Sequence, residues 1–159
     1  MTDGIRSFNK LFDVDLTVDT NAYAVNDVLA AAQEITNVFP DSGVEAILQS
    51  VVAIDYDDQG KDFDIIFLDK EVSFGDENAA CDPTDAAASH ILAVVSMTSW
   101  TDLINCQVAQ EEIASGDEGM GMVLEPSGTN TSLWVAAIAR EIATYAGGVI
   151  KLRIGLKRG

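Results

Sequence analysis

Three stretches of this chain carry apolar residues on alternate positions, and this period of two constrains the fold more than any other feature. The stretches cover residues 44–56, 63–67 and 150–156. Successive side chains of a β-strand point to opposite faces, so the pattern predicts half-buried strands. The residues predicted to share a core face are Val44, Ala46, Leu48, Val52, Ile54 and Tyr56 in the first stretch, interrupted only by Ser50, Phe63, Ile65 and Phe67 in the second, and Ile150, Leu152, Ile154 and Leu156 in the third.

The residues between the first two stretches have the chemistry of a turn. They read DDQGKD, from Asp57 to Asp62, and contain Gly60. A short polar segment of this kind between two alternating stretches is typical of a hairpin. We therefore expect residues 44–68 to form one long antiparallel hairpin.

The remaining segments predict further short strands and one short helix. Thr84 is a suitable N-cap for a helix over residues 85–90, and ILAVVSM after it has strand character. Residues 105–126 predict one or two strands around an acidic, glycine-rich loop. The segment TSLWVAAIAREIATYA suits a helix or a strand, and we predict strands because Trp134, Ala136 and Ile138 alternate. Many short strands and frequent turns indicate an all-β, antiparallel β-sandwich of jelly-roll-like type.

Length and composition favour a single domain with an N-terminal extension. The 159 residues are 48% hydrophobic and 22% charged, which is typical of one globular domain. We predict an N-terminal arm over residues 1–20, ending in a short strand, and a sandwich domain over residues 21–159. The arm carries Phe8, Leu11 and Phe12, which pack either on their own domain or on another chain. If they bind another chain, deleting residues 1–16 should leave the fold intact.

Charge excludes some partners and suggests another. The chain has 26 acidic and 9 basic residues and a net charge of −17, the wrong sign for a nucleic-acid surface. Lys151 and Arg153 belong to a basic C-terminal segment, which either lies in solvent or docks on an acidic face of a neighbour. No run of about 18 apolar residues and no signal-peptide pattern is present, so we expect no membrane partner.

Residues with catalytic chemistry are few and scattered. The single histidine, His90, precedes an apolar segment and is expected to be a cap or a packed surface group. Cys81 and Cys106 have no metal-ligand spacing, and we take both as free thiols, with one bridge as the alternative. Trp100 and Trp134 suit buried or interface positions, or a stacking platform for a sugar. We expect no catalytic residue, no metal ion and no cofactor.

Two acidic loops resemble binding loops in part. In DYDDQGKDFD, Asp55, Asp57 and Gly60 occupy positions one, three and six of a calcium loop, but Ile66 stands at position twelve, where a glutamate is needed. In SGDEGMGM, Asp117 and Glu118 lie among glycines without a phosphate-binding pattern. A turn explains the first loop and a surface loop explains the second.

Several motifs taken in order resemble a family of small virion proteins of tailed bacteriophages. NAYAVNDVL matches an AYA-x-[GN]-D-V start, and residues 48–68 match LxSVxxxDxxxxGxxxDxxFL. TDAAASHILAVVSM and SLWVAAIA follow, so that the resemblance covers about residues 20–140. The chain departs from the pattern at Ala93, where glycine is frequent, and in its charged C-terminal end. Both departures affect the expected contact surface.

The resemblance implies a β-sandwich decoration, or cement, protein. Such a protein sits on the outer capsid surface of a virion assembled in the host cytoplasm, bridges subunits of the major capsid protein, and acts as a homotrimer or other small oligomer without an active site. The interface candidates are Phe8, Leu11 and Phe12 in the arm and Lys151 and Arg153 in the last strand. Alternatives are another virion component, in the tail, neck or fibre base, and a carbohydrate-binding module.

Overall fold

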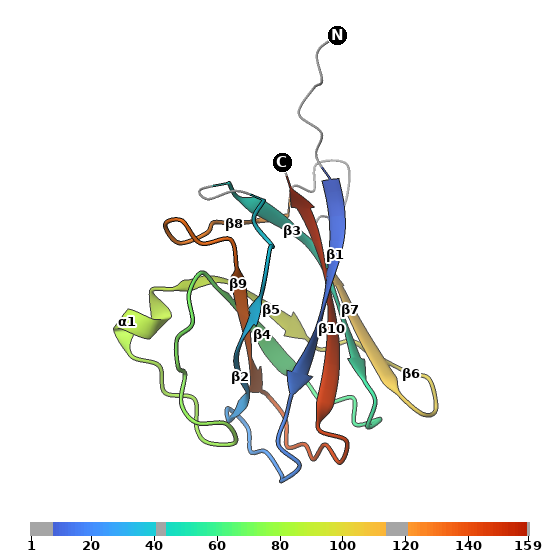
Figure 1. Cartoon of the computed structure of the whole chain (residues 1–159). Coiled ribbons are helices and arrows are strands. Elements are labelled where there is room, and N and C mark those ends of the chain that lie inside the picture. The colour runs from blue at the N-terminus through green and yellow to red at the C-terminus, as the bar shows by residue number, and fades with distance from the viewer. Residues whose placement is uncertain (1–7, 41–43, 114–120, 159) are drawn as a thin grey trace.

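The computed structural model describes residues 8–40, 44–113 and 121–158 and consists of two antiparallel sheets packed face to face (Figure 1). The first sheet has the order β1-β10-β3-β7-β6, with β8 also pairing with β3. The second sheet has the order β2-β9-β4-β5. The strands are β1 (Phe8–Thr17), β2 (Val28–Ile35), β3 (Ala46–Asp55), β4 (Phe63–Leu68), β5 (Ile91–Met97), β6 (Trp100–Asp102), β7 (Gln107–Glu112), β8 (Met122–Leu124), β9 (Leu133–Ala139) and β10 (Val149–Arg158).

The path of the chain is that of a jelly roll. From β1 to β4 each successive strand crosses to the other sheet, and β9 and β10 also lie in different sheets. As a result, β10 is inserted between β1 and β3, and β9 between β2 and β4. Two interleaved Greek keys of this kind define the jelly-roll form of the β-sandwich. The predicted all-β, antiparallel fold with one short helix is confirmed.

The main core lies between the sheets and is built from alternate residues of each strand. β10 has the predicted pattern, since Ile150, Leu152, Ile154 and Leu156 are all at most 1% exposed. Phe63, Ile65 and Phe67 of β4 meet them from the second sheet and are equally buried. Burial of large side chains from both inner faces is the main source of stability in a sandwich.

A smaller apolar cluster covers the outer face of the second sheet. Its buried residues are Val28, Ile66, Leu68, Phe74, Ala136 and Ile138. Residues 69–90 pass over this face and include the helix α1 (Asp85–Ala88) (Figure 1). The predicted cap is confirmed, because the Thr84 side chain accepts a hydrogen bond from the Ala87 N–H at 3.1 Å. Burial on both faces also explains why the sequence of β9 is apolar throughout and suited a helix as well as a strand.

The predicted hairpin over residues 44–68 is wrong, because β3 and β4 lie in different sheets. The chain turns at Asp55, whose side chain is buried. Its carboxylate accepts hydrogen bonds from the backbone N–H groups of Asp57, Gln59 and Gly60, each at 2.9 Å. Asp58 and Gly60 adopt left-handed backbone angles within this turn. The loop therefore carries the chain from one sheet to the other, whereas a hairpin would keep it in one.

The predicted core face of residues 44–56 is correct only in its first half. Ala46 and Leu48 are buried as expected, but beyond Ser50 the buried residues are Val51, Ala53 and Asp55. The pairing with β10 shifts by one residue here, since Gly155 pairs with Ser50 while Leu156 pairs with Leu48. A β-bulge of this kind moves the following side chains to the opposite face. Tyr56 is consequently 52% exposed.

The described part of the predicted arm is a strand of the domain. Residues 8–17 form β1 and pair along their whole length with β10, from Phe8 opposite Arg158 to Thr17 opposite Val149. Phe12, Leu16 and Val18 belong to the main core. Deleting residues 1–16 would remove nearly all of β1 from the sheet, so the structure leads us to expect that this deletion destabilises the fold, in contrast to the sequence-based expectation. Residues 1–7 and the acidic loop at 114–120 lie outside the described residues.

We predict that Asp55→Asn lowers the free energy of unfolding by about 1–3 kcal/mol, because an amide presents only one acceptor oxygen to three partly buried N–H groups. Urea unfolding followed by tryptophan fluorescence measures this change. Asp58→Asn is the matched control, since Asp58 is exposed in the same turn and asparagine tolerates its left-handed backbone. Equal stability of the two variants would contradict the proposed role of Asp55.

Candidate protein-interaction surface

β1 lies at the end of the first sheet, and one side of its backbone faces away from β10. The amide side chain of Gln33 covers the C-terminal part of this edge. Its Oε1 accepts the Thr17 N–H at 3.1 Å, and its Nε2 donates to the Asp15 carbonyl at 2.9 Å. The Gln33 side chain therefore makes the hydrogen bonds to Asp15 and Thr17 that a neighbouring strand would otherwise make. Outward-facing backbone groups recur every second residue, so those of Asn9, Leu11 and Asp13 continue the same edge.

The five predicted interface residues all lie in β1 or β10, but they differ in accessibility. Leu11 is 64% exposed, whereas Phe12 is only 9% exposed and packs in the core. The side-chain nitrogen of Lys10 lies over the Phe12 ring, 4.8 Å from its centre. Of the apolar arm residues whose side chains are described, Leu11 alone is free to contact another molecule. Phe8 belongs to β1, and its side chain lies outside the description.

Lys151 and Arg153 are paired within the chain. Lys151 Nζ lies 3.7 Å from an Asp15 carboxylate oxygen, and Arg153 Nε lies 3.4 Å from one of Asp13. These pairs are cross-strand neighbours of β1 and β10 and are partly exposed. Exposed ion pairs contribute little to stability, so both cations can still reach a partner. The basic strand nevertheless meets an acidic strand of its own domain first.

A second exposed apolar feature lies at the turn between β6 and β7. Leu103 is 55% exposed and Ile104 is 83% exposed, and we call these two residues the hairpin tip. Two hydrogen bonds fix its shape: Leu103 N–H to the Cys106 carbonyl at 2.9 Å, and Ile104 N–H to Asp102 Oδ1 at 2.7 Å. The hairpin projects from one side of the sandwich, away from α1 (Figure 1).

Ile104 also carries an unfavourable backbone angle, with φ at +78°. Besides Ile104, the positive-φ residues other than glycine in the described chain are Asn26, Asn37, Asp58 and Asn78. Asparagine and aspartate tolerate this conformation, whereas a β-branched residue in it is strained by about 1–2 kcal/mol. The tip thus combines backbone strain with exposure of apolar surface to water. Such strain is concentrated at binding and functional sites.

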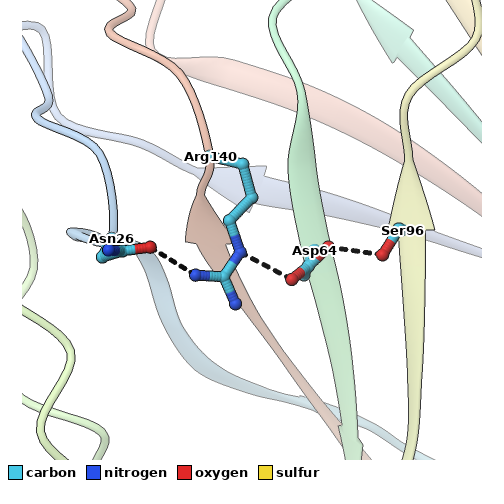
Figure 2. Close-up of polar contacts among 4 residues, drawn as sticks. All are labelled: Asn26, Asp64, Ser96 and Arg140. Carbon is cyan, nitrogen blue, oxygen red and sulfur yellow. Dashed lines mark hydrogen bonds and ion pairs between the residues drawn. The ribbon is translucent and has the colours of Figure 1, made fainter.

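A polar network joins the strand ends of the second sheet (Figure 2). Arg140 donates from Nε to Asp64 at 2.6 Å and from its terminal nitrogen to the Asn26 side chain. Ser96 donates to the other Asp64 oxygen at 2.6 Å. Both oxygens of Asp64 are therefore engaged, and the group links the ends of β9 and β4 to β5 and to the turn before β2. Arg140 and Asp64 therefore hold neighbouring strands together, and this structural role accounts for both charged residues.

His90 has a carboxylate partner that the sequence did not reveal. Its Nδ1 lies 2.8 Å from Asp69 Oδ1, and its carbonyl accepts the Asp69 N–H at 3.2 Å. The pair joins the segment after β4 to the start of β5. Both cysteines are free thiols, as expected, and burial raises the pKa of the Cys81 thiol. A protonated thiol is a poor nucleophile, so this environment does not activate Cys81.

The remaining candidates serve the fold. In the loop that resembles a calcium loop, the first carboxylate, that of Asp55, accepts hydrogen bonds from backbone N–H groups. Among the described residues, no three His, Cys, Asp or Glu side chains are placed to share a metal ion. Trp100 packs on Phe63 with ring centres 5.8 Å apart, and Trp134 packs against the smaller apolar cluster. The two tryptophans belong to different sheets and do not form one platform. In the same part of the chain there is no helix with the length and apolar character needed to span a membrane.

Comparison with known proteins leaves the family open. No family model matches the chain, and no curated protein matches it. Among solved structures, one from Desmodium yellow mottle tymovirus has a TM-score of 0.30 at 9% identity, covering 99% of this chain and 90% of that one. One from Sacbrood virus of honeybee has a TM-score of 0.33 at 14% identity, covering 96% and 69%. Likenesses this low carry no argument about function.

We predict that Ile104→Asn raises the free energy of unfolding by about 1 kcal/mol, because asparagine relieves the left-handed strain and little packing is lost. Leu103→Asn is the matched control, since Leu103 is also exposed but has no positive φ. Chemical denaturation of both variants gives the comparison. A loss of stability in Ile104→Asn would show that the side chain is held by contacts within the domain.

Proposed function

We propose that this chain is a structural protein of a virion, and that within this class it is a decoration protein. It binds the outer surface of the shell formed by the major capsid protein of a tailed bacteriophage and stabilises that shell. The observation that carries the proposal is the hairpin tip, where strain and exposed apolar surface coincide at Ile104. The strained angle lowers stability, and binding a protein surface would give this exposed apolar residue a use.

The resemblance to phage virion proteins supplies the kind of partner, and its motifs have structural explanations in this fold. In AYAVND, the buried Tyr23 donates its hydroxyl to the Leu29 carbonyl at 3.0 Å, and Asp27 accepts the Ala24 N–H at 2.8 Å. Asn26 takes a left-handed angle between them. Asp55 and Gly60 shape the crossing between the sheets. These motif residues shape turns of the sandwich, and we infer that loops such as the hairpin tip, outside the motifs, fit the shell.

Stabilisation follows from mass action. A protein that binds the assembled lattice but not the separate subunits raises the free energy of disassembly at every occupied site. Many copies on one particle make this effect large even where a single contact is small. The net charge of −17 suits an outer position, because it keeps particles dispersed. The proposal assigns no catalysis to the chain and treats His90 and Asp69 as a structural pair.

A place in the tail, neck or fibre base is separated from the shell by copy number. We predict hundreds of copies in particles purified from the virus whose genome encodes this chain, because a shell has many equivalent sites. Quantitative mass spectrometry against the major capsid protein measures the ratio. Six or twelve copies per particle would contradict decoration of the shell.

Point variants of the hairpin tip test the contact itself. We predict that the double variant Leu103→Asp, Ile104→Asp lowers binding to particles stripped of this protein at least tenfold, because two carboxylates lose apolar contact and must be desolvated. Ile142→Asp is the matched control, since Ile142 is 68% exposed on a different loop. Co-sedimentation with particles gives the affinity, and urea unfolding checks that each variant is folded. Equal binding by all three proteins would overturn the role of the tip.

A further inference from the structure

The free part of the β1 edge is short and well defined. Gln33 closes the edge at Asp15 and Thr17, and β10 pairs with the opposite side of the strand. The groups that continue the open side are the N–H and C=O of Asn9, Leu11 and Asp13. Within the described residues no other strand pairs with β1. An edge of this kind is a template for one further antiparallel strand.

We propose that this edge pairs with the same edge of a second copy of the chain, across a two-fold axis at Leu11. In this register Leu11 faces Leu11 of the second copy, and Asn9 faces Asp13 in both directions. All three positions direct their backbone groups outward, so the two copies exchange the full set of ladder hydrogen bonds. The first sheets of the two copies then form one continuous sheet. Such an isologous contact needs only one surface to be self-complementary.

The side chains in this register are complementary. Leu11 is 64% exposed in the single copy and gains an apolar cross-strand neighbour. Asn9 can donate its amide to Asp13 of the second copy, whose carboxylate lies beside that copy's own Arg153. On the other face, Lys10 lies opposite Phe12 of the second copy, the type of ring it already contacts in its own chain at 4.8 Å. A shift of the register by two residues would instead place Leu11 opposite a polar residue.

The surface beside Leu11 has room for this contact. Gly155 is the cross-strand neighbour of Leu11, and both border a hollow of about 200 Å³ that is also lined by Ser50 and neighbouring residues. Leu11 can lean into this hollow as the second leucine packs against it. A side chain at position 155 would collide with Ser50 Oγ. The proposal does not rest on the decoration function, and it leaves the hairpin tip free to bind a shell or to form a three-fold contact.

Disulfide trapping tests the register directly. Directly opposed residues of a hydrogen-bonded pair have Cα atoms about 5.5 Å apart, within the range of a disulfide. In a chain with Cys81→Ala and Cys106→Ser, we expect Leu11→Cys to form a covalent dimer under mild oxidation. Ile142→Cys in the same background is the control, because Ile142 is exposed to a similar extent, 68% against 64% for Leu11, and lies on a loop outside β1. Urea unfolding confirms that both variants are folded.

Sedimentation equilibrium of the full-length protein gives the second measurement. A contact this small binds weakly, so we expect dimer to accumulate only as the concentration approaches about 1 mM. Higher salt should strengthen it, because the copies each carry −17 and repel one another. Leu11→Lys should abolish the dimer by opposing two like charges, whereas Ile142→Lys should not.

Disulfide trapping and sedimentation together distinguish pairing through the β1 edge from the absence of such pairing. A dimer that is trapped by Leu11→Cys and lost in Leu11→Lys supports the two-fold pairing. The proposal is overturned if Leu11→Cys and Ile142→Cys crosslink equally, or if the wild-type chain and Leu11→Lys have the same mass at every concentration. Binding to particles is measured separately, through the hairpin tip, so either proposal can fail while the other stands.

Discussion

The pairing of β1 with β10 is the constraint on which the rest of the structure depends. It joins the first described residues to the last ones in an uninterrupted ten-residue register. β10 in turn pairs with β3, and its four inward side chains fill the centre of the core. The first sheet is therefore complete only when residues 8–17 and 149–158 are both in place. Contacts between residues so far apart in sequence are slow to form, because a long loop must close first.

The position of β1 at the end of a sheet also determines where other molecules can bind. A strand placed last has one unpaired side, and the chain closes part of it with the amide of Gln33. The hairpin tip has a similar origin, since β6 is a three-residue strand at the other end of the same sheet. Both surfaces therefore result from the positions of β1 and β6 at the two ends of the first sheet. Each surface exposes an apolar side chain, Leu11 at the β1 edge and Ile104 at the hairpin tip.

The sequence predicts the strands of this fold better than their partners. Alternation in residues 63–67 and 150–156 identifies the buried face correctly, because each side of a strand meets one environment. The same reasoning fails after Ser50, since the extra residue Gln49 forms a bulge that reverses the faces, and alternation does not show where a bulge falls. It also fails at Asp55: a buried carboxylate that organises a crossing loop looks, in sequence, like the polar start of a hairpin turn.

The candidate surface was predictable only in part, for a related reason. Leu11 could be found because an apolar residue among charges suggests exposure, and Phe12 has the same signal although it is buried. Lys151 and Arg153 read as a free basic patch until the register places Asp15 and Asp13 beside them. Ile104 gives no signal, since its significance comes from a backbone angle. A sequence records which residues are apolar, whereas exposure and strain depend on the partners that the fold supplies.

Negative charge and the proposed strand pairing act against each other in this chain. Copies that each carry −17 repel in solution, and this repulsion prevents the open edge of β1 from recruiting further strands without limit. The proposed two-fold pairing also stops at two copies, because the β1 edge of each copy is then hydrogen-bonded to that of the other. On a shell, neighbouring copies would be held at fixed sites, and their effective concentration would far exceed that in solution. A contact too weak to form a dimer in dilute solution would then link adjacent sites, so acidity would confine strand pairing to the assembled particle.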